Sequence, residues 1–148
     1  MAEPLPVADS SLFFKLVRVV NLTARPFNET VGKAHRLTLN EWRAMVVIAS
    51  HPGVAAADVA ESTGLDKMAI SRAIAGLDDA GRLLRKADPA DQRRSLLFLN
   101  AEGQRVFAKV GRTAKRREAE LYEGLQPCEL EQLGATLDKL IAAVHRRC

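Results

Sequence analysis

The chain has 148 residues, 47% hydrophobic and 27% charged, with a mean hydropathy of -0.09, so it is a folded chain of one-domain size rather than a disordered one. No apolar run approaches the roughly 20 residues that cross a bilayer, and the start MAEPLPVADSS lacks the features of a signal peptide. We therefore expect a cytoplasmic protein without membrane contact. The formal net charge of +4 is modest, so the position of the charge matters more than its sum.

The sequence contains none of the short motifs that are typical of disulfide, metal or catalytic sites. Cys128 and Cys148 form no CxxC pair, and the three histidines share no ligand spacing, which argues against a disulfide framework and a zinc site. There is no phosphate-binding glycine loop, no GxSxG and no HExxH. We expect no enzymatic activity, no cofactor and no metal.

Two amphipathic helices are predicted in the first third of the chain. Apolar residues recur at helical spacing between residues 10 and 31, and Pro26 predicts a kink or break near Thr23 to Pro26. The second helix spans residues 37–50 and ends at His-Pro-Gly. Its predicted apolar face consists of Leu39, Trp42, Val46 and Ala49.

Two short helices joined through Gly64 predict a helix-turn-helix over residues 55–80. Residues 54–63 form the first helix, and Gly64 suits the left-handed backbone of a helix end. Asp66 is a good N-cap for the second helix, which closes at Gly81. The residues of that helix expected to point inward are Ile70, Ala73, Ile74 and Leu77.

A hairpin follows over residues 83–99. Strands at residues 83–86 and 96–99 flank the polar stretch DPADQRRS, Asp88 to Ser95. The positive charge of the chain is concentrated here, in Arg82, Arg85, Lys86, Arg93 and Arg94. Asn100 can cap a helix over residues 101–122, and Pro127 opens a last helix with a sustained apolar seam. The expected fold is mainly α with a small β-hairpin.

The outward residues of the helix after Gly64 suit DNA recognition. A helix fits the major groove, where Lys67, Arg72 and Ser71 can reach bases or phosphates, and Met68 lies on the same face. At the hairpin tip, Gln92, Arg93 and Arg94 can reach the minor groove or phosphates, with Asp91 holding the Arg93 guanidinium or bracing the loop. The helix or the hairpin taken alone is explained as well by a solvated surface without a partner. Their order along the chain, helix-turn-helix and then hairpin, favours a winged helix-turn-helix.

The sequence resembles the multiple antibiotic resistance regulator (MarR) family of bacterial transcription factors. The resemblance covers LTLNEWRAM, VAESTGLDKMAISRAIAGLDDAGRL, DPADQRRSLLFLNAEG and LQPCELEQL, and the wing pattern DPxDxR is its most specific part. It implies a homodimer on a palindromic operator, acting as a repressor that a small ligand often releases. Residues 1–36 and 101–148 would then dimerise, and residues 37–100 would form the winged lobe.

The resemblance also implies roles for single residues. Lys67, Met68, Ser71 and Arg72 match the DNA-facing positions of the recognition helix, and Asp91 with Arg93 match the wing pair. Two departures, Ala55 and Gln126, replace serines that often cap helices in relatives, each at a local cost of about 1 kcal/mol. Neither departure touches the proposed DNA surface.

Three further interpretations remain open. Relatives often bind an aromatic or phenolic effector beside the lobe, and His35, Trp42 and Arg43 lie in the region that would line such a pocket. Cys128, in the first turn of a helix, suits a thiol-based redox sensor. A winged helix can also serve as a protein-protein interaction module, in which case the wing arginines would meet an acidic partner.

Overall fold

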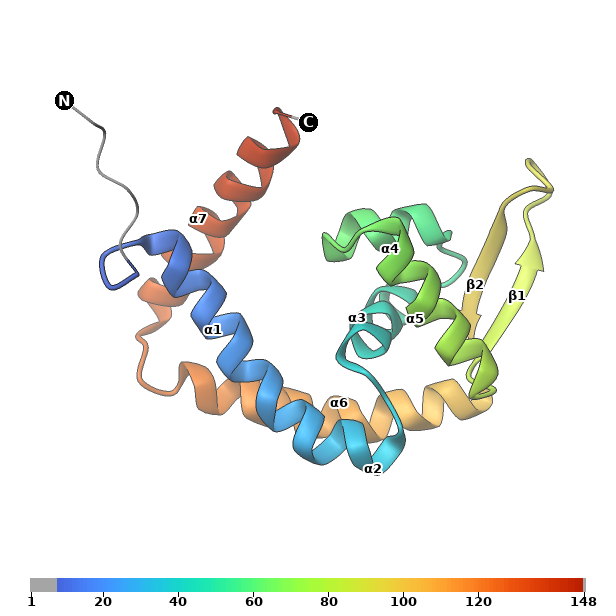
Figure 1. Cartoon of the computed structure of the whole chain (residues 1–148), viewed down its shortest axis with the longest axis horizontal. Coiled ribbons are helices and arrows are strands. Elements are labelled where there is room, and N and C mark those ends of the chain that lie inside the picture. The colour runs from blue at the N-terminus through green and yellow to red at the C-terminus, as the bar shows by residue number, and fades with distance from the viewer. Residues whose placement is uncertain (1–7, 148) are drawn as a thin grey trace. The chain divides into compact units, whose positions relative to one another are not determined.

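The structure, a computed structural model, describes residues 8–147 and is mainly helical with one two-stranded antiparallel hairpin (Figure 1). This confirms the fold class expected from the sequence. The chain divides into two compact units: one ends at Val110 and the other begins at Gly111. Among residues 8–147, no helix has both the length and the apolar character needed to span a bilayer.

The first unit begins with a long helical segment. Helix α1 spans Leu12–Phe27, and the Oγ of Ser11 accepts a hydrogen bond from the Phe14 N–H at 3.2 Å. Of the kink or break predicted near Thr23 to Pro26, the break does not occur, because α1 runs through Pro26. The helical geometry instead widens one turn later, in the π-helix η1 over Asn28–Gly32. Proline removes only one donor, and a helix that keeps its other hydrogen bonds need not end there.

The short helix α2, Lys33–His35, ends where Arg36 adopts a φ of 47°, in the left-handed region. Helix α3, Leu39–Ser50, starts with a capping box: Thr38 Oγ1 accepts from the Glu41 N–H at 3.1 Å, and the Glu41 carboxylate accepts from the Thr38 N–H at 2.8 Å. These bonds satisfy N–H groups that have no partner within a helix.

The buried face of α3 differs from the predicted one. Ala44, Met45 and Ile48 are fully buried, whereas Val46, expected on the core face, is 38% exposed. Leu39, Trp42 and Ala49 pack against the core only in part. Because α3 is apolar around most of its circumference, periodicity alone did not distinguish the two faces.

Helices α4, Ala56–Thr63, and α5, Lys67–Asp79, form the helix-turn-helix. Ala55 gives α4 no side-chain cap, in line with the departure noted in the sequence. Gly64 has a φ of 71°, and Asp66 Oδ1 accepts from the Ala69 N–H at 2.7 Å, as predicted. The predicted inward face is confirmed, since all four residues are at most 4% exposed: Ile70, Ala73, Ile74 and Leu77.

The hairpin consists of β1, Leu83–Ala87, and β2, Ser95–Leu99, paired antiparallel from Leu83 opposite Leu99 to Ala87 opposite Ser95. Each strand is one residue longer than predicted. Leu97 is buried and forms a bridge to Val54, just before α4. The middle of β2 is therefore held against the segment that leads into the helix-turn-helix, while the hairpin tip extends from the lobe (Figure 1).

Helix α6, Ala101–Tyr122, begins at Asn100, whose Oδ1 accepts from the Gly103 N–H at 2.9 Å. A Cβ at Gly103 would lie 2.1 Å from the Arg82 carbonyl oxygen, so only glycine allows α6 to pass so close to the hairpin base. In the first turn of α6, hydrogen bonds from Arg105 hold the pKa of Glu102 below its ordinary value.

The second unit contains the end of α6 and helix α7, Pro127–His145. The Glu129 carboxylate accepts from the Gln126 N–H at 2.8 Å, so the start of α7 is hydrogen-bonded despite the loss of a serine cap. No residue of α7 is buried. The apolar seam predicted for α7 is exposed to solvent in the single chain: Leu140 is 47%, Ile141 56% and Val144 61% exposed.

Candidate nucleic-acid interface

The outward face of α5 carries the residues predicted to contact DNA. Lys67, Met68, Ser71 and Arg72 are all exposed, and Met68 is 69% exposed. Their orientation follows from the core, because the helical period turns these positions to solvent once Ile70, Ile74 and Leu77 are buried. The capping carboxylate of Asp66 fixes where this face begins.

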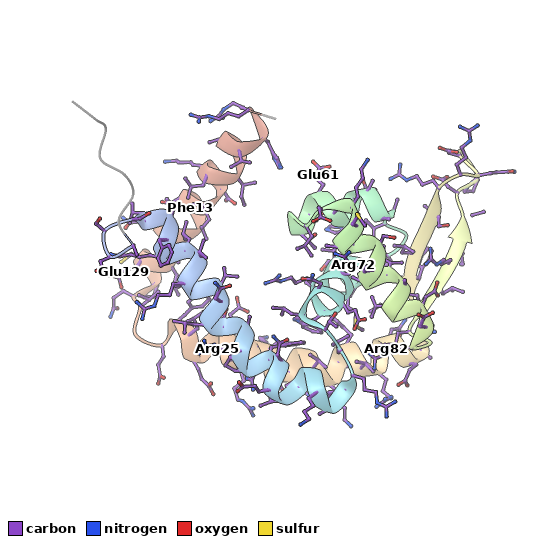
Figure 2. All side chains as sticks on the ribbon, in the orientation of Figure 1. Phe13, Arg25, Glu61, Arg72, Arg82 and Glu129 are labelled. Carbon is purple, nitrogen blue, oxygen red and sulfur yellow. The ribbon has the colours of Figure 1, made fainter. Side chains whose placement is uncertain are left out.

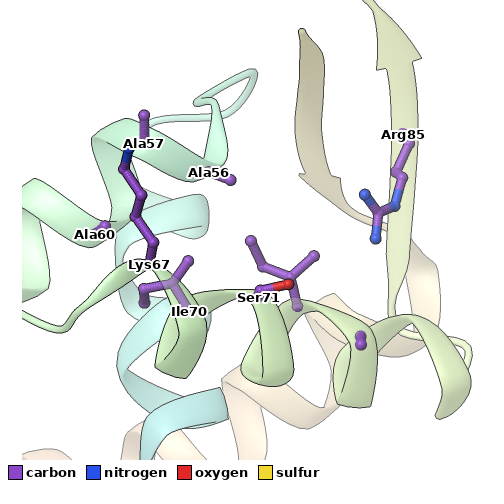
Figure 3. Close-up of a pocket in the computed structure, with 9 residues that line it drawn as sticks. Ala56, Ala57, Ala60, Lys67, Ile70, Ser71 and Arg85 are labelled. Atoms are coloured by element: carbon purple, nitrogen blue, oxygen red, sulfur yellow. The ribbon is translucent and has the colours of Figure 1, made fainter. Parts of the chain in front are cut away.

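A pocket of about 330 Å³ lies between α4, α5 and β1 (Figure 3). Lys67 and Ser71 of α5 and Arg85 of β1 supply its polar groups, with Lys67 extending towards α4 in the close-up. The rest of the lining is apolar and mostly small: Ala56, Ala57, Ala60, Ile70, Ile74 and Ala75.

A second pocket, of about 450 Å³, lies between the start of α4 and the wing. Its charged lining residues are Asp58, Arg85, Asp91, Arg93 and Arg94. Both pockets share Ala56, Ala57 and Arg85, so the outward face of α5, the start of α4 and the wing form one hollowed surface. We call this hollowed surface the lobe groove.

Asp91 shapes the wing tip through the backbone. Its Oδ1 accepts a hydrogen bond from the Arg93 N–H at 3.0 Å, and its carbonyl oxygen accepts from the Arg94 N–H at 2.9 Å. Asp88 closes the loop, since its N–H donates to the Arg94 carbonyl at 3.0 Å and its Oδ1 accepts from the Ala90 N–H at 2.9 Å. Of the two roles expected for Asp91, the structure shows the loop brace.

The two adjacent wing arginines differ in their partners. The Arg94 guanidinium pairs with the Asp58 carboxylate of α4, and both side chains are about half exposed. Arg93 is exposed, and within the described part of the chain it has no carboxylate partner. Gln92 beside it is also exposed.

Two further cations of the hairpin, Arg85 and Lys86, have partners within the lobe. Arg85 pairs with Asp78 of α5 at 2.8 Å, and the Lys86 Nζ lies 5.0 Å from the centre of the Phe98 ring. The partners of Arg85 and Arg94 come from other elements, seven and 36 residues earlier in the chain. No local sequence pattern signals such pairings, and sequence reasoning missed them.

Arg82 is not part of the basic surface of the hairpin, although the sequence analysis grouped it with the hairpin cations. It is 8% exposed, and its guanidinium donates to the carbonyl oxygens of His35 and, at 3.4 Å, of Arg36. A cation at the carbonyl end of a helix is stabilising. Arg82 therefore joins the end of α2 to the base of the hairpin (Figure 2), a contact that the sequence analysis did not foresee.

The residues predicted to line an effector pocket lie in α2 and α3. Trp42 stacks between Phe27, with ring centres 6.4 Å apart, and Phe107, at 5.3 Å. Arg43 donates to Asn40 Oδ1 at 3.3 Å, and the backbone of His35 binds Arg82. Cys128, the residue of the redox alternative, is exposed in the first turn of α7.

A helix-turn-helix followed by a basic, braced hairpin defines a winged helix-turn-helix protein. The model of the MarR family matches residues 36–94 of the chain. The winged lobe of the chain therefore matches the MarR family of winged-helix transcriptional regulators.

Individual relatives support this assignment. A candidate transcriptional regulatory protein for the hcr operon of Thauera aromatica is 25% identical over 129 residues, covering 87% of this chain and 78% of that protein. The transcriptional regulator HosA of Escherichia coli O111:H- is 32% identical over 72 residues, covering 49% of this chain and 53% of HosA. The crystal structure of CouR from Rhodococcus jostii RHA1 bound to p-coumaroyl-CoA has a TM-score of 0.81 and 22% identity, covering 93% of this chain and 96% of CouR.

Proposed function

We propose that this regulator is a homodimeric repressor that binds a palindromic operator in double-stranded DNA through the lobe groove. The observation that carries the proposal is a set of exposed cations without carboxylate partners in the described part of the chain, on α5 and the wing tip: Lys67, Arg72 and Arg93. Phosphates bind such cations and release counterions, which is the main source of affinity in protein-DNA complexes.

Helix α5 enters the major groove and the wing lies over the adjacent minor groove or its phosphates. Arg72 and Lys67 suit guanine O6 and N7 or phosphate oxygens, and Ser71 suits either base edges or the backbone. Arg93 and Gln92 at the tip reach the minor groove, while Asp91 holds the loop in shape. Arg94 contributes less, because its partner Asp58 must first be displaced.

The terminal helices support the homodimer. Eight apolar residues of α1 are at least 38% exposed, among them Phe13 at 75% (Figure 2), and the seam of α7 is similarly open. Exposed apolar area of this extent is uncommon on a monomer and marks an association surface. A second copy of the chain would cover it, and the spacing of the two lobes would then set the spacing of the operator half-sites.

A small aromatic acid as effector is a second part of the proposal. It rests on Trp42 and Arg43, which are neighbours in sequence on α3, and on His35 at the end of α2. CouR provides a structural parallel, since it was crystallised with p-coumaroyl-CoA. Binding there would act on the end of α2, whose carbonyl oxygens Arg82 contacts from the base of the hairpin.

Arg93→Ala tests the DNA surface. We expect it to weaken binding to every sequence by about 1–3 kcal/mol and to lower the slope of log affinity against log salt by about one. Arg105→Ala is the matched control, because Arg105 has the same charge but is paired within α6. Binding is measured by fluorescence anisotropy on the DNA upstream of the gene at two salt concentrations, with and without aromatic acids.

Two results would contradict the proposal. Equal affinities of wild type and Arg93→Ala at both salt concentrations would remove the wing from the interface. Failure of the wild-type protein to bind any duplex, combined with binding to an acidic protein partner, would favour the protein-protein interaction module instead.

A further inference from the structure

The outward face of α5 lacks the side chains that read adenine. Asparagine and glutamine are the residues that pair with adenine N6 and N7, and the α5 sequence KMAISRAIAGLDD contains neither. Arg72 and Lys67 suit guanine, and Ser71 discriminates weakly. Of the two α5 carboxylates, Asp78 is paired with Arg85. A helix of this composition can recognise an A·T pair mainly through the 5-methyl group of thymine.

Met68 is the side chain of this face that suits a methyl group. It is 69% exposed, whereas Leu84 and Val46, the other exposed large apolar residues between residues 37 and 100, are 46% and 38% exposed. It lies in the first turn of α5, the part of a recognition helix that contacts base edges in many helix-turn-helix proteins. Its unbranched thioether adapts to irregular apolar surfaces.

The charges around Met68 point to DNA rather than to an apolar protein surface as its partner. Lys67 precedes it, Arg72 follows one turn later, and both are exposed. An apolar protein surface would have to desolvate both cations, whereas in the major groove thymine methyl groups lie between two rows of phosphates. The combination of one apolar and two cationic side chains therefore matches a thymine-containing major groove.

We propose that Met68 contacts a thymine 5-methyl group in each operator half-site and so sets the preference of this regulator for thymine at that position. The proposal rests on the proposed function, because it requires α5 to lie in the major groove. It predicts an operator in which replacing one particular thymine per half-site by uracil, which lacks only the methyl group, weakens binding.

The experiment uses a duplex that the full-length protein retains from a randomised pool. Each thymine of the half-site is replaced in turn by deoxyuridine, and affinities are measured by anisotropy. We expect about a fourfold loss at one position per half-site, because burying a methylene-sized group contributes about 0.8 kcal/mol and 1.4 kcal/mol is tenfold. Replacing cytosine by 5-methylcytosine in a duplex with cytosine at that position should restore part of the affinity.

Three variants assign the effect to Met68. Met68→Ala should bind the thymine duplex more weakly and lose the uracil penalty at the same position, which gives a coupling in the double-mutant cycle. Met68→Leu keeps an apolar side chain of similar volume and should keep the penalty. Met68→Gln keeps the length but is polar and should lose it. Thermal unfolding curves show that each variant is folded.

The outcomes separate the two proposals. If the wild-type protein retains no duplex, the proposed function itself is wrong. If it retains a duplex but no uracil substitution changes affinity more than about 1.5-fold, or if Met68→Ala keeps the same penalty as wild type, Met68 does not read thymine although the protein binds DNA.

Discussion

The winged lobe and the terminal helices use their apolar residues in opposite ways. In the lobe, Met45, Ile48, Val59 and Leu77 are completely buried. In α1, only Phe27 is buried, and in α7 no residue is. The lobe therefore buries its own hydrophobic residues within one chain, whereas the terminal helices leave most of theirs exposed in the single chain.

This difference predicts two kinds of stability. A residue of the lobe core should affect folding at any protein concentration. A residue of the terminal helices should affect folding mainly through association, which depends on concentration. Polar contacts on the lobe surface should affect DNA binding more than they affect folding or association.

Leu77→Ala should produce the largest loss. Leu77 is fully buried at the centre of the lobe, and removing such a side chain leaves a cavity that costs about 2–5 kcal/mol. Urea unfolding followed by circular dichroism measures the change at two protein concentrations. Leu84→Ala, 46% exposed in β1, is the control and should cost about 1 kcal/mol or less. A loss that appears at only one concentration would contradict the comparison.

Ile141→Glu should weaken the proposed dimer and leave the fold of the lobe intact. Ile141 is 56% exposed in the single chain, and loss of its burial against a partner would cost about 1.5–3 kcal/mol per protomer. Sedimentation equilibrium should show a shift towards monomer, while the circular dichroism spectrum stays helical. Lys139→Ala, which changes a charge on the same helix, should leave the association constant unchanged. An unchanged dimer in Ile141→Glu would remove α7 from the interface.

Asp58→Asn should have the smallest effect on folding. It should slightly lower the free energy of unfolding but raise the affinity for DNA. The Arg94–Asp58 pair is about half exposed, so its loss should cost only about 0.2–1 kcal/mol of unfolding free energy. Freed from Asp58, Arg94 can reach a phosphate, so DNA affinity should rise and the salt slope should steepen by about one. Asp79→Asn removes a charge elsewhere on the lobe as a control. Weaker DNA binding by Asp58→Asn would show that the pair positions the wing.

Much of the lobe was predictable because its signals are local. The helix-turn-helix follows from Gly64, the Asp66 cap and the spacing of Ile70, Ile74 and Leu77, all of which act within a few residues. The wing strands were likewise predicted to within one residue. The buried face of α3 was not, because an apolar residue on each side of a helix leaves the choice to the surrounding core.

The sequence by itself determined the class of fold, the resemblance of the lobe to the MarR family and the residues that we propose for DNA contact, since these depend on short patterns within the chain. Only the tertiary structure decided how neighbouring residues divide their roles. Arg82 became a buried link to α2, Arg94 a partner of Asp58, and Arg93 remained open to a ligand. The reason is physical: an arginine is chemically the same at all three positions, and only the carbonyl or carboxylate that folding brings within reach determines what it does.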